Sequence, residues 1–565
     1  MSTSSQLNSL TSRPMTQSSV KHHSDSYEEI VYAAGENYSL QLTAQSLSQL
    51  DYAKNCKVHD FTSDSAHPQH FTSFHTVFST HLNTDESSKH YENYRVENIS
   101  NSSFTLLTTR AITNKGNVTS DIYMCGRALG VGFHISDNNN DPPSFSGTVS
   151  STNHSLLYSW SSNNLIPTLQ QVDHDFWKLK SETNEQSVCI VDSSVGFEHS
   201  VIVFSNGKAM ACGRNKKGQC GTGDFVDVPK WKLIPTEYHI VKASCGSYHT
   251  VFLARPHDSS KVTKLIYCGA FNTDRGDVFH NKLETLMECR NRNGEKHSEN
   301  TTVMVEDEQF VDVKCGQNYT CVLTSSGKVY AFGRNAQGQC GNLTSKTISK
   351  PTLMKGLDKM KILKIACGSS HTLLLTDTHH VMVVGNNEPG QLGIGDVRTR
   401  FIPERNEFFA RMWDKKTDAT PLTSMKWPFE ELPKYYDYVK DIACGPYHSA
   451  FVTICSDVYV CGLACFGQLG IGVFANGVVV PVKLNLHNAL PSSYIQQKNL
   501  EFSPPKMIGM NSATKEWRVF TSHNNSTFLV QTCVKGRIVR FHKLLLKSLR
   551  LEKDQCKFSD LVLIC

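Results

Sequence analysis

The stretch VYAFGRNAQGQCG, residues 329–341, decides the fold because its glycine-rich part returns along the chain. The same phrase reads GRNKKGQCG at 213–221, GNNEPGQLG at 385–393 and GLACFGQLG at 462–470. Each copy follows a short apolar run, which is typical of a buried strand that ends in a glycine turn. A unit of strands and turns that recurs at roughly 50 residues predicts a propeller or a repeat array instead of a single compact core.

A second phrase, of the type C-G-x-x-H-T, recurs between the copies of the first. It reads VGFEHS at 195–200, CGSYHT at 245–250, CGSSHT at 367–372 and CGPYHS at 444–449, with the variant CGQNYT at 315–320. Aligning the two phrases predicts the blades. They span about Val188–Val228, Val241–His280, Val311–Ser345, Lys364–Arg398 and Asp441–Ala475, with a weaker copy at Val96–Gly132.

The two ends of the repeat region hold complementary halves of a unit. VFTSHNNSTFLV at 519–530 has the pattern of a first half, and VYAAGENYSLQLT at 31–43 has that of a second half. A blade built from both halves would remove exposed sheet edges, so we expect Val31–Ala34 to pair with the sheet that contains Thr527–Val530. The predicted fold is therefore all-β, a seven-bladed β-propeller over residues 31–535 that is closed through both termini.

Outside the repeats the composition changes. Residues 1–30 are predicted to be a disordered tail, because the stretch is rich in Ser, Thr and Gln and has no apolar core. Long insertions are expected at 133–187, 281–310, 403–440 and 483–517. Phe541–Lys553 has helical apolar spacing and 558–565 is strand-like, so a short C-terminal helix and strand are expected.

Charge and cysteine content exclude several classes of function. The net charge of +5 over 565 residues is weak and no run of Lys or Arg stands out, so neither direct nucleic-acid binding nor membrane binding is predicted. The 19 cysteines include no C-x-x-C pair, and many occupy equivalent points of different repeats. They are interpreted as small buried apolar residues in a reducing compartment, the cytoplasm or the nucleus, with the cytoplasm favoured.

The sequence predicts no catalytic residue, no cofactor and no metal site, and hence no enzyme. The repeated histidines His199, His249, His371 and His448 each belong to a different blade and cannot converge as zinc ligands do. We expect them to make hydrogen bonds that tie strands within each blade. The glycine phrase lacks the Lys-Ser/Thr ending of a phosphate loop, and no specific catalytic motif is present.

The insertion at 403–440 is rich in aromatic residues and is the candidate partner-binding loop, because exposed Trp and Tyr dominate binding hot spots. The alternative is that it packs on the propeller as a satellite cluster. The candidate residues are Phe408, Phe409, Trp413, Trp427, Tyr435 and Tyr436.

The repeated phrases resemble the regulator of chromosome condensation repeat family, whose members form seven-bladed β-propellers. The resemblance covers most of residues 31–530 outside the insertions, although GAFN at 269–272 departs from the G-x-N pattern. The closing segment FSDLVLIC, residues 558–565, is similar to the opening strand of a BTB (POZ) domain. Residues 541–565 are accordingly expected to be a linker helix and the beginning of a BTB-like domain.

The resemblance implies a protein–protein interaction scaffold, specifically a BTB-linked ubiquitin-ligase substrate adaptor or regulator. The alternative that it implies is a guanine-nucleotide exchange factor for a Ran-like small GTPase. Such a factor does no bond chemistry and accelerates nucleotide release by binding the nucleotide-free GTPase more tightly. The expected partners are thus proteins, either a small GTPase or a component of a cullin-type ligase.

Overall fold

The described part of the chain is one compact unit, Tyr27–Val534. The computed structural model describes residues 27–36, 70–79, 91–101, 104–113, 118–127, 165–171, 188–257, 261, 264–273, 276–290, 303–306, 308–414, 438–472, 475–484, 515–521 and 526–534. The predicted tail up to residue 26 and the predicted C-terminal helix and strand at 541–565 lie outside these ranges.

Six sheets are each built from consecutive strands, and their neighbours are antiparallel except for the pair β14–β15. The first two contain β3 (Tyr91–Asn101), β4 (Phe104–Thr113), β5 (Val118–Arg127) and β6 (Leu165–Gln171), then β7 (Ile190–Val195), β8 (His199–Phe204), β9 (Ala209–Gly213) and β10 (Val228–Leu233). The third contains β11 (His239–Cys245), β12 (His249–Arg255), β13 (Lys264–Thr273), β14 (Gly276–Arg290) and β15 (Val303–Glu306). The fourth contains β16 (Phe310–Cys315), β17 (Tyr319–Thr324), β18 (Val329–Gly333) and β19 (Ile348–Leu353). The last two contain β20 (Ile362–Cys367), β21 (His371–Thr376), β22 (Val381–Gly385) and β23 (Arg400–Arg405), then β24 (Val439–Cys444), β25 (His448–Thr453), β26 (Val458–Gly462) and β27 (Val478–Lys483).

A further sheet combines strands from the two ends of the repeat region. Its order is β2 (His70–Ser79), β1 (Tyr27–Glu36), β29 (Ser526–Val534) and β28 (Lys515–Thr521). Val31 pairs with Val530 and Ala34 pairs with Thr527, so the predicted pairing of the two half-repeats is present. Sequence reasoning missed β2 because this strand carries neither repeated phrase.

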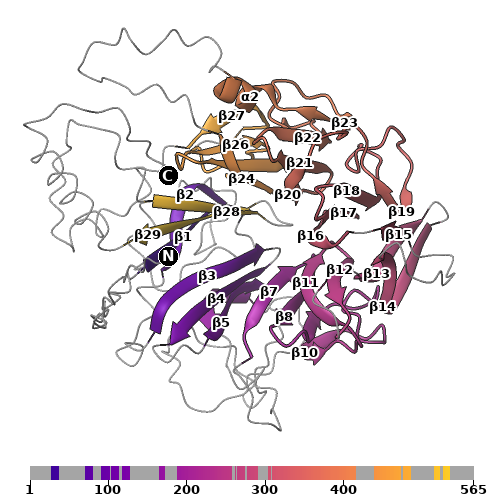
Figure 1. Cartoon of the computed structure of the whole chain (residues 1–565). Helices are drawn as coiled ribbons and strands as arrows, with labels where there is room; N and C mark the ends of the chain where they lie inside the picture. Colours follow the sequence, from indigo (N-terminus) through magenta and orange to yellow (C-terminus); the bar gives the residue numbers. More distant parts are fainter. Residues whose placement is uncertain are drawn as a thin grey trace, which may run out of the picture. The chain divides into compact units, whose positions relative to one another are not determined.

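The first strands of the sheets lie next to one another and form the inside of an all-β propeller. In order, β3 contacts β7, β7 contacts β11, and the series continues through β16, β20 and β24 to β28, which also contacts β3. Figure 1 shows β16, β20 and β28 toward the middle and the fourth strands β10, β19, β23 and β27 toward the periphery. Each blade therefore runs outward from its first strand to its fourth.

Several outer strands lie inside segments that the sequence assigned to insertions. β6 falls within 133–187, and β14 and β15 occupy parts of 281–310. The fourth strands are difficult to recognise because they have only one weakly buried face: in β10 (VPKWKL), only Val228 and Trp231 are buried. An edge strand needs few apolar side chains, so its sequence pattern is short and weak.

The core lies between adjacent blades and is built mainly from the second and third strands. Every described side chain of β8, β17, β21 and β25 is buried. The interpretation of the repeated cysteines is confirmed for Cys212, Cys245, Cys315 and Cys444, which are buried free thiols. Burial raises the pKa of Cys245 and of Cys315 to about 12, so both remain protonated and unreactive.

Candidate protein-binding face

One end of the blades carries all the glycine-rich connections. Each first strand turns into its second strand there, and each third strand passes into its fourth. We call this end the loop face. Its described residues are 196–198, 214–227, 246–248, 316–318, 334–347, 368–370, 386–399, 445–447, 463–472 and 475–477. Connections on a rigid scaffold are the usual place for function, so this face is the candidate binding site.

A buried asparagine holds each G-x-N loop in one conformation. Asn387 Nδ2 donates to the carbonyl of Asp396 (2.7 Å), and Asn387 Oδ1 accepts from the Leu392 amide (2.9 Å). Asn215 makes the same two bonds, to Asp224 O (2.8 Å) and from Cys220 N (2.9 Å). The G-x-N spacing therefore encodes an internal clamp that closes the loop, which explains why the Asn recurs.

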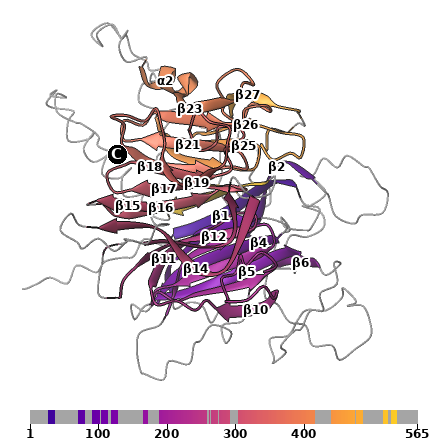
Figure 2. The ribbon, with the colours of Figure 1, turned by 90° about the vertical axis from the view of Figure 1, so that its right-hand side faces the viewer.

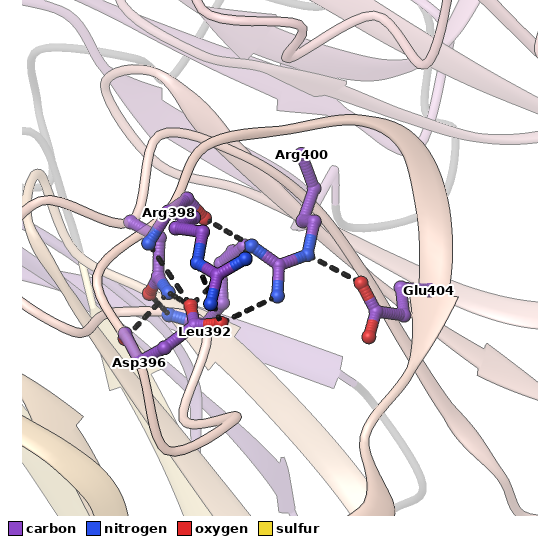
Figure 3. A network of polar contacts seen from close by, with 6 residues as sticks. Leu392, Asp396, Arg398, Arg400 and Glu404 are labelled. Atoms are coloured by element: carbon purple, nitrogen blue, oxygen red, sulfur yellow. Dashed lines mark hydrogen bonds and ion pairs between the residues drawn. The ribbon is translucent and has the colours of Figure 1, made fainter.

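Charged side chains reinforce the loop around Asp396. Figure 3 shows Arg400 between Asp396 and Glu404, with Arg398 beside them. Arg400 Nη2 lies 2.8 Å from Asp396 Oδ2, and its Nε is paired with Glu404. The hydrogen bond from Arg400 holds the pKa of Asp396 below its usual value, so the carboxylate stays ionised and the loop stays fixed.

The middle glycines of the G-x-N-x-x-G-Q-x-G phrases lie directly on the fourth strand of the next blade. Gly338 and Gly390 both have positive φ, at 75° and 84°. A Cβ added to Gly338 would lie 2.6 Å from Arg400 O, and one added to Gly390 would lie 2.7 Å from Val479 Cα. Close approach of two backbones requires glycine here, so the phrase has a structural role.

The repeated histidines bond to the following blade, which corrects the prediction that they tie strands within one blade. His199 Nε2 lies 2.9 Å from Thr250 Oγ1, and His371 Nε2 lies 3.0 Å from Ser449 Oγ. In the C-G-x-x-Y-T variant, Tyr319 Oη takes the same role at 3.0 Å from the hydroxyl of Thr372. The acceptor lies one blade further along the chain because each second strand packs against the first strand of the next blade, whose own second strand supplies the hydroxyl.

These bonds define the protonation state of the histidines. The hydroxyl of Ser449 donates to the carbonyl of Gln391 (2.6 Å), so its oxygen is left to accept from the Nε2–H of His371. Burial lowers the pKa of both His371 and His448 to about 3, so both are neutral. Among the described residues no group of three His, Cys, Asp or Glu is placed to hold a metal ion. The absence of a metal site stays a prediction for the whole chain.

The described part of the aromatic insertion is a short helix on the blade β24–β27. In α2 (Glu407–Asp414), Asn406 Oδ1 caps the helix by accepting from Phe408 N at 3.1 Å. Phe409 is only 5% exposed and its ring lies 4.6 Å from that of Phe451. Figure 2 shows α2 beside β23 and β27. Phe408 and Phe409 thus stabilise the helix on the blade.

The remaining candidate aromatic positions lie outside the described side chains. These are Trp413, whose backbone belongs to α2, and Trp427, Tyr435 and Tyr436. The partner-binding loop at 403–440 therefore stays a prediction.

The loop face carries exposed aromatic side chains elsewhere: Phe225 in the β9–β10 connection, and Phe197, Tyr248 and Tyr447 in the turns between first and second strands. Phe197 is 46% exposed and Tyr248 is 37% exposed, and their ring centroids are 6.1 Å apart in an edge-to-face arrangement. Sequence reasoning missed both. The available signal was their position, because they occupy the variable places of the C-G-x-x-H-T phrase. The blades with CGQNYT and CGSSHT carry only Ser, Gln or Asn there, whereas CGPYHS carries Pro446 and Tyr447.

A long hairpin replaces the glycine loop in the third blade. β13 and β14 stay paired from Gly269–His280 to Thr273–Gly276, which explains why this blade departs from the G-x-N pattern. Phe279 on this hairpin is exposed, and Lys217 Nζ of the preceding blade lies 4.1 Å from its ring centroid.

The opposite end of the first strands carries alternating charges at equivalent positions. They are Asp192, Lys242, Asp312, Lys364 and Asp441 in five successive blades. Lys242 Nζ lies 2.7 Å from Asp312 Oδ1, and Lys364 is paired with Asp441. These bridges join neighbouring first strands, and we call the five residues the charge belt.

Comparison with known proteins supports the repeat assignment. Residues 206–253 and 326–375 match one profile of the regulator of chromosome condensation (RCC1) repeat, and residues 190–219, 310–339 and 362–391 match a second. The chain therefore contains RCC1 repeats.

Curated relatives share the repeat region over part of their length. The ultraviolet-B receptor UVR8 of Arabidopsis thaliana is 26% identical over 54% of this chain and 59% of the receptor. The X-linked retinitis pigmentosa GTPase regulator of Canis lupus familiaris is 34% identical over 31% of this chain and 15% of that protein. The probable E3 ubiquitin-protein ligase HERC4 of Rattus norvegicus is 27% identical over 45% of this chain and 20% of the ligase. The matches thus span less than two thirds of each relative.

A solved structure confirms the fold. Prp20p from Saccharomyces cerevisiae, described with its binding properties to Gsp1p and histones, superimposes with a TM-score of 0.55 at 15% identity. The superposition covers 92% of this chain and 95% of Prp20p. No helix in the described ranges is long and apolar enough to cross a membrane.

Proposed function

We propose that this chain is a protein–protein interaction scaffold that binds its partner on the loop face. The single observation that carries the proposal is the exposed aromatic pair Phe197–Tyr248. Both residues lie in tight turns, which are closed by the bonds from Gly196 N to His199 O and from Gly246 N to His249 O (2.8 Å each). Aromatic side chains on preorganised loops contribute binding energy at a low cost in conformational entropy. Such a site needs no catalytic group, in keeping with a protein that is not an enzyme.

We propose in addition that the composite sheet is a seventh blade that closes the propeller. The contacts of β28 with β24 on one side and with β3 on the other support this arrangement. In a closed ring every blade packs against a neighbouring blade on both sides. The connections of the loop face are then carried by a rigid scaffold.

Within the scaffold class, the first candidate is a BTB-linked ubiquitin-ligase substrate adaptor or regulator. The likeness of residues 558–565 to the start of a BTB domain supports it, as does the RCC1-repeat relative that is a probable ubiquitin ligase. The second candidate is a guanine-nucleotide exchange factor for a Ran-like GTPase. It is supported by the fold shared with Prp20p, whose binding to Gsp1p is described, and by the relative named a GTPase regulator.

The cytoplasm is the proposed compartment, since the described cysteines are free thiols.

Site-specific photocrosslinking tests which face binds a partner. A photoreactive amino acid is placed at Leu343, exposed on the loop face, or at Leu363, exposed at the opposite end of the blades. We expect a protein adduct from position 343 and little from position 363, with the adducts identified by mass spectrometry. Adducts formed only from position 363 would show that the loop face is not the binding site.

Two assays then separate the candidates. Adducts that co-purify with a cullin support the adaptor, and faster release of labelled GDP from a Ran-like GTPase supports the exchange factor. Absence of acceleration across a panel of small GTPases would eliminate the second candidate.

A further inference from the structure

The second, third and fourth blades carry aromatic and basic side chains on neighbouring connections of the loop face. Its centre is the edge-to-face pair of Phe197 and Tyr248, which belong to adjacent blades. We define the aromatic–basic patch as these two residues together with Arg214, Lys216 and Arg334. An exposed aromatic pair with arginines on the adjoining connections combines the two residue types that are most enriched in binding hot spots.

Backbone bonds connect the members of the patch. The Arg214 amide donates to the carbonyl of Glu198 (2.8 Å), the residue that follows Phe197. On the other side, the Ser247 amide donates to the carbonyl of Gln317 (3.0 Å), and the Arg334 amide donates to the carbonyl of Asn318 (2.8 Å). The patch therefore extends over three neighbouring blades and is held by main-chain contacts.

The charge of the patch is predominantly positive. Arg334 is exposed, and no described carboxylate pairs with it. Lys216 is 65% exposed and lies a loose 3.8 Å from Asp227. The Arg214 guanidinium is 2.9 Å from the Glu198 carboxylate, which is itself largely covered. The three cations of the patch are thus accompanied by two carboxylates that pair with them, Glu198 and Asp227, while Asp224 on the same loop pairs with Lys232.

We propose that the aromatic–basic patch binds an acidic protein segment that places an apolar side chain against Phe197 and Tyr248. Asp or Glu residues of the segment pair with Arg214 and Arg334, whose guanidinium groups favour carboxylates. The proposal rests on the proposed function of the loop face and specifies the chemistry of its partner. The partner is a protein segment and not a nucleic acid for two reasons. The rings meet edge to face and offer no parallel stacking platform, and the chain has a pI of about 8.3.

Selection from a random dodecapeptide display library on the immobilised full chain tests this chemistry. We expect enrichment of peptides that combine Asp or Glu with an aromatic or aliphatic residue. Binding of an enriched peptide should weaken by about tenfold on either Phe197→Ser or Arg334→Glu. It should also weaken between about 50 mM and about 300 mM NaCl, because exposed charge pairs are screened.

Matched controls come from the blade β20–β23. Val397→Ser and Arg398→Glu change an exposed apolar residue and an exposed arginine of the loop face outside the patch. Both should leave peptide binding unchanged. All four substituted side chains are exposed, so the melting temperature should stay close to that of the unchanged protein, which excludes unfolding as the cause.

Three results would overturn the proposal. One is enrichment of basic or uncharged peptides, and another is an equal loss of binding in the control variants. The third is a single-stranded oligonucleotide of about 20 nucleotides that competes fully with the enriched peptide, which would assign the patch to nucleic acid. If photocrosslinked partners still form adducts from position 343 in the Phe197→Ser variant, the scaffold function stands and only the patch assignment fails.

Discussion

At Gly333 the absence of a side chain allows two strands of one blade to approach each other closely. Its φ is 103°, and an added Cβ would lie 2.6 Å from both Asn318 O and Tyr319 Cα. We expect Gly333→Val to destabilise the protein by a few kcal/mol, since strain and a backbone clash act together. Gly395→Val is the control because Gly395 has φ 87° but nothing within 4 Å of the added Cβ, so only the strain remains. Urea unfolding that gave equal losses for both variants would contradict the role of close approach.

At the same scale, the buried histidines predict a dependence of stability on pH. The pKa of His371 and of His448 is about 3 in the folded protein, against 6.5 for the ordinary group. The unfolded chain therefore binds more protons below pH 6.5, and the free energy of unfolding should fall by about 1.4 kcal/mol per histidine for each further pH unit. Urea unfolding between about pH 7.5 and about pH 5 measures this slope.

The chain itself supplies the variant that tests this assignment. Tyr319 occupies the equivalent place in a neighbouring blade and reaches the next hydroxyl without a titrating imidazole. In the His371→Tyr variant, the free energy of unfolding should therefore depend less steeply on pH, by the contribution of one histidine. The bond between the blades should be kept. An unchanged slope would show that His371 is not neutral and buried in the folded protein.

At the scale of the elements, the charge belt joins first strands that share no ladder hydrogen bonds. The Lys242–Asp312 bridge is 2.7 Å long and both side chains are mostly covered. Burial opposes ionisation of Asp312, but the nearby Lys314 and Lys242 outweigh it and lower the pKa of this carboxyl. The bridge should thus couple the two strands more strongly than an exposed ion pair does.

A double-mutant cycle with Lys242→Met and Asp312→Asn measures that coupling. We expect about 1–2 kcal/mol, against about 0.5 kcal/mol or less for the exposed pair Lys232–Asp224, whose bridge is 3.1 Å long. Equal coupling energies in the two cycles would mean that the belt does not contribute to the joining of blades.

At the scale of the whole molecule, the composite sheet depends on a strand far from its partners in sequence. Deleting residues 1–43 removes β1 and leaves both β2 and β29 without their shared neighbour. We expect a clear drop in melting temperature, because apolar contacts of Val31, Ala33 and Ala34 are lost and an edge is exposed. Deleting only residues 1–26 keeps β1 and is the control. If both deletions melted at the temperature of the full chain, the composite sheet would not support the propeller.

The sequence by itself determined the repeat, the second and third strands of most blades, the glycine turns and the pairing of the two half-repeats. The repeat phrases are encoded by residue spacing within a few tens of positions, and the pairing of the half-repeats followed because each half, recognisable locally, lacks the other. Only the tertiary structure decided which blade supplies the acceptor of each histidine, since His371 and Ser449 are 78 residues apart and meet through packing. It also decided the outer strands such as β6 and β14, whose apolar pattern is weak. The pair Phe197–Tyr248 could not be predicted either, because two variable positions of a phrase become one surface only when neighbouring blades bring them together.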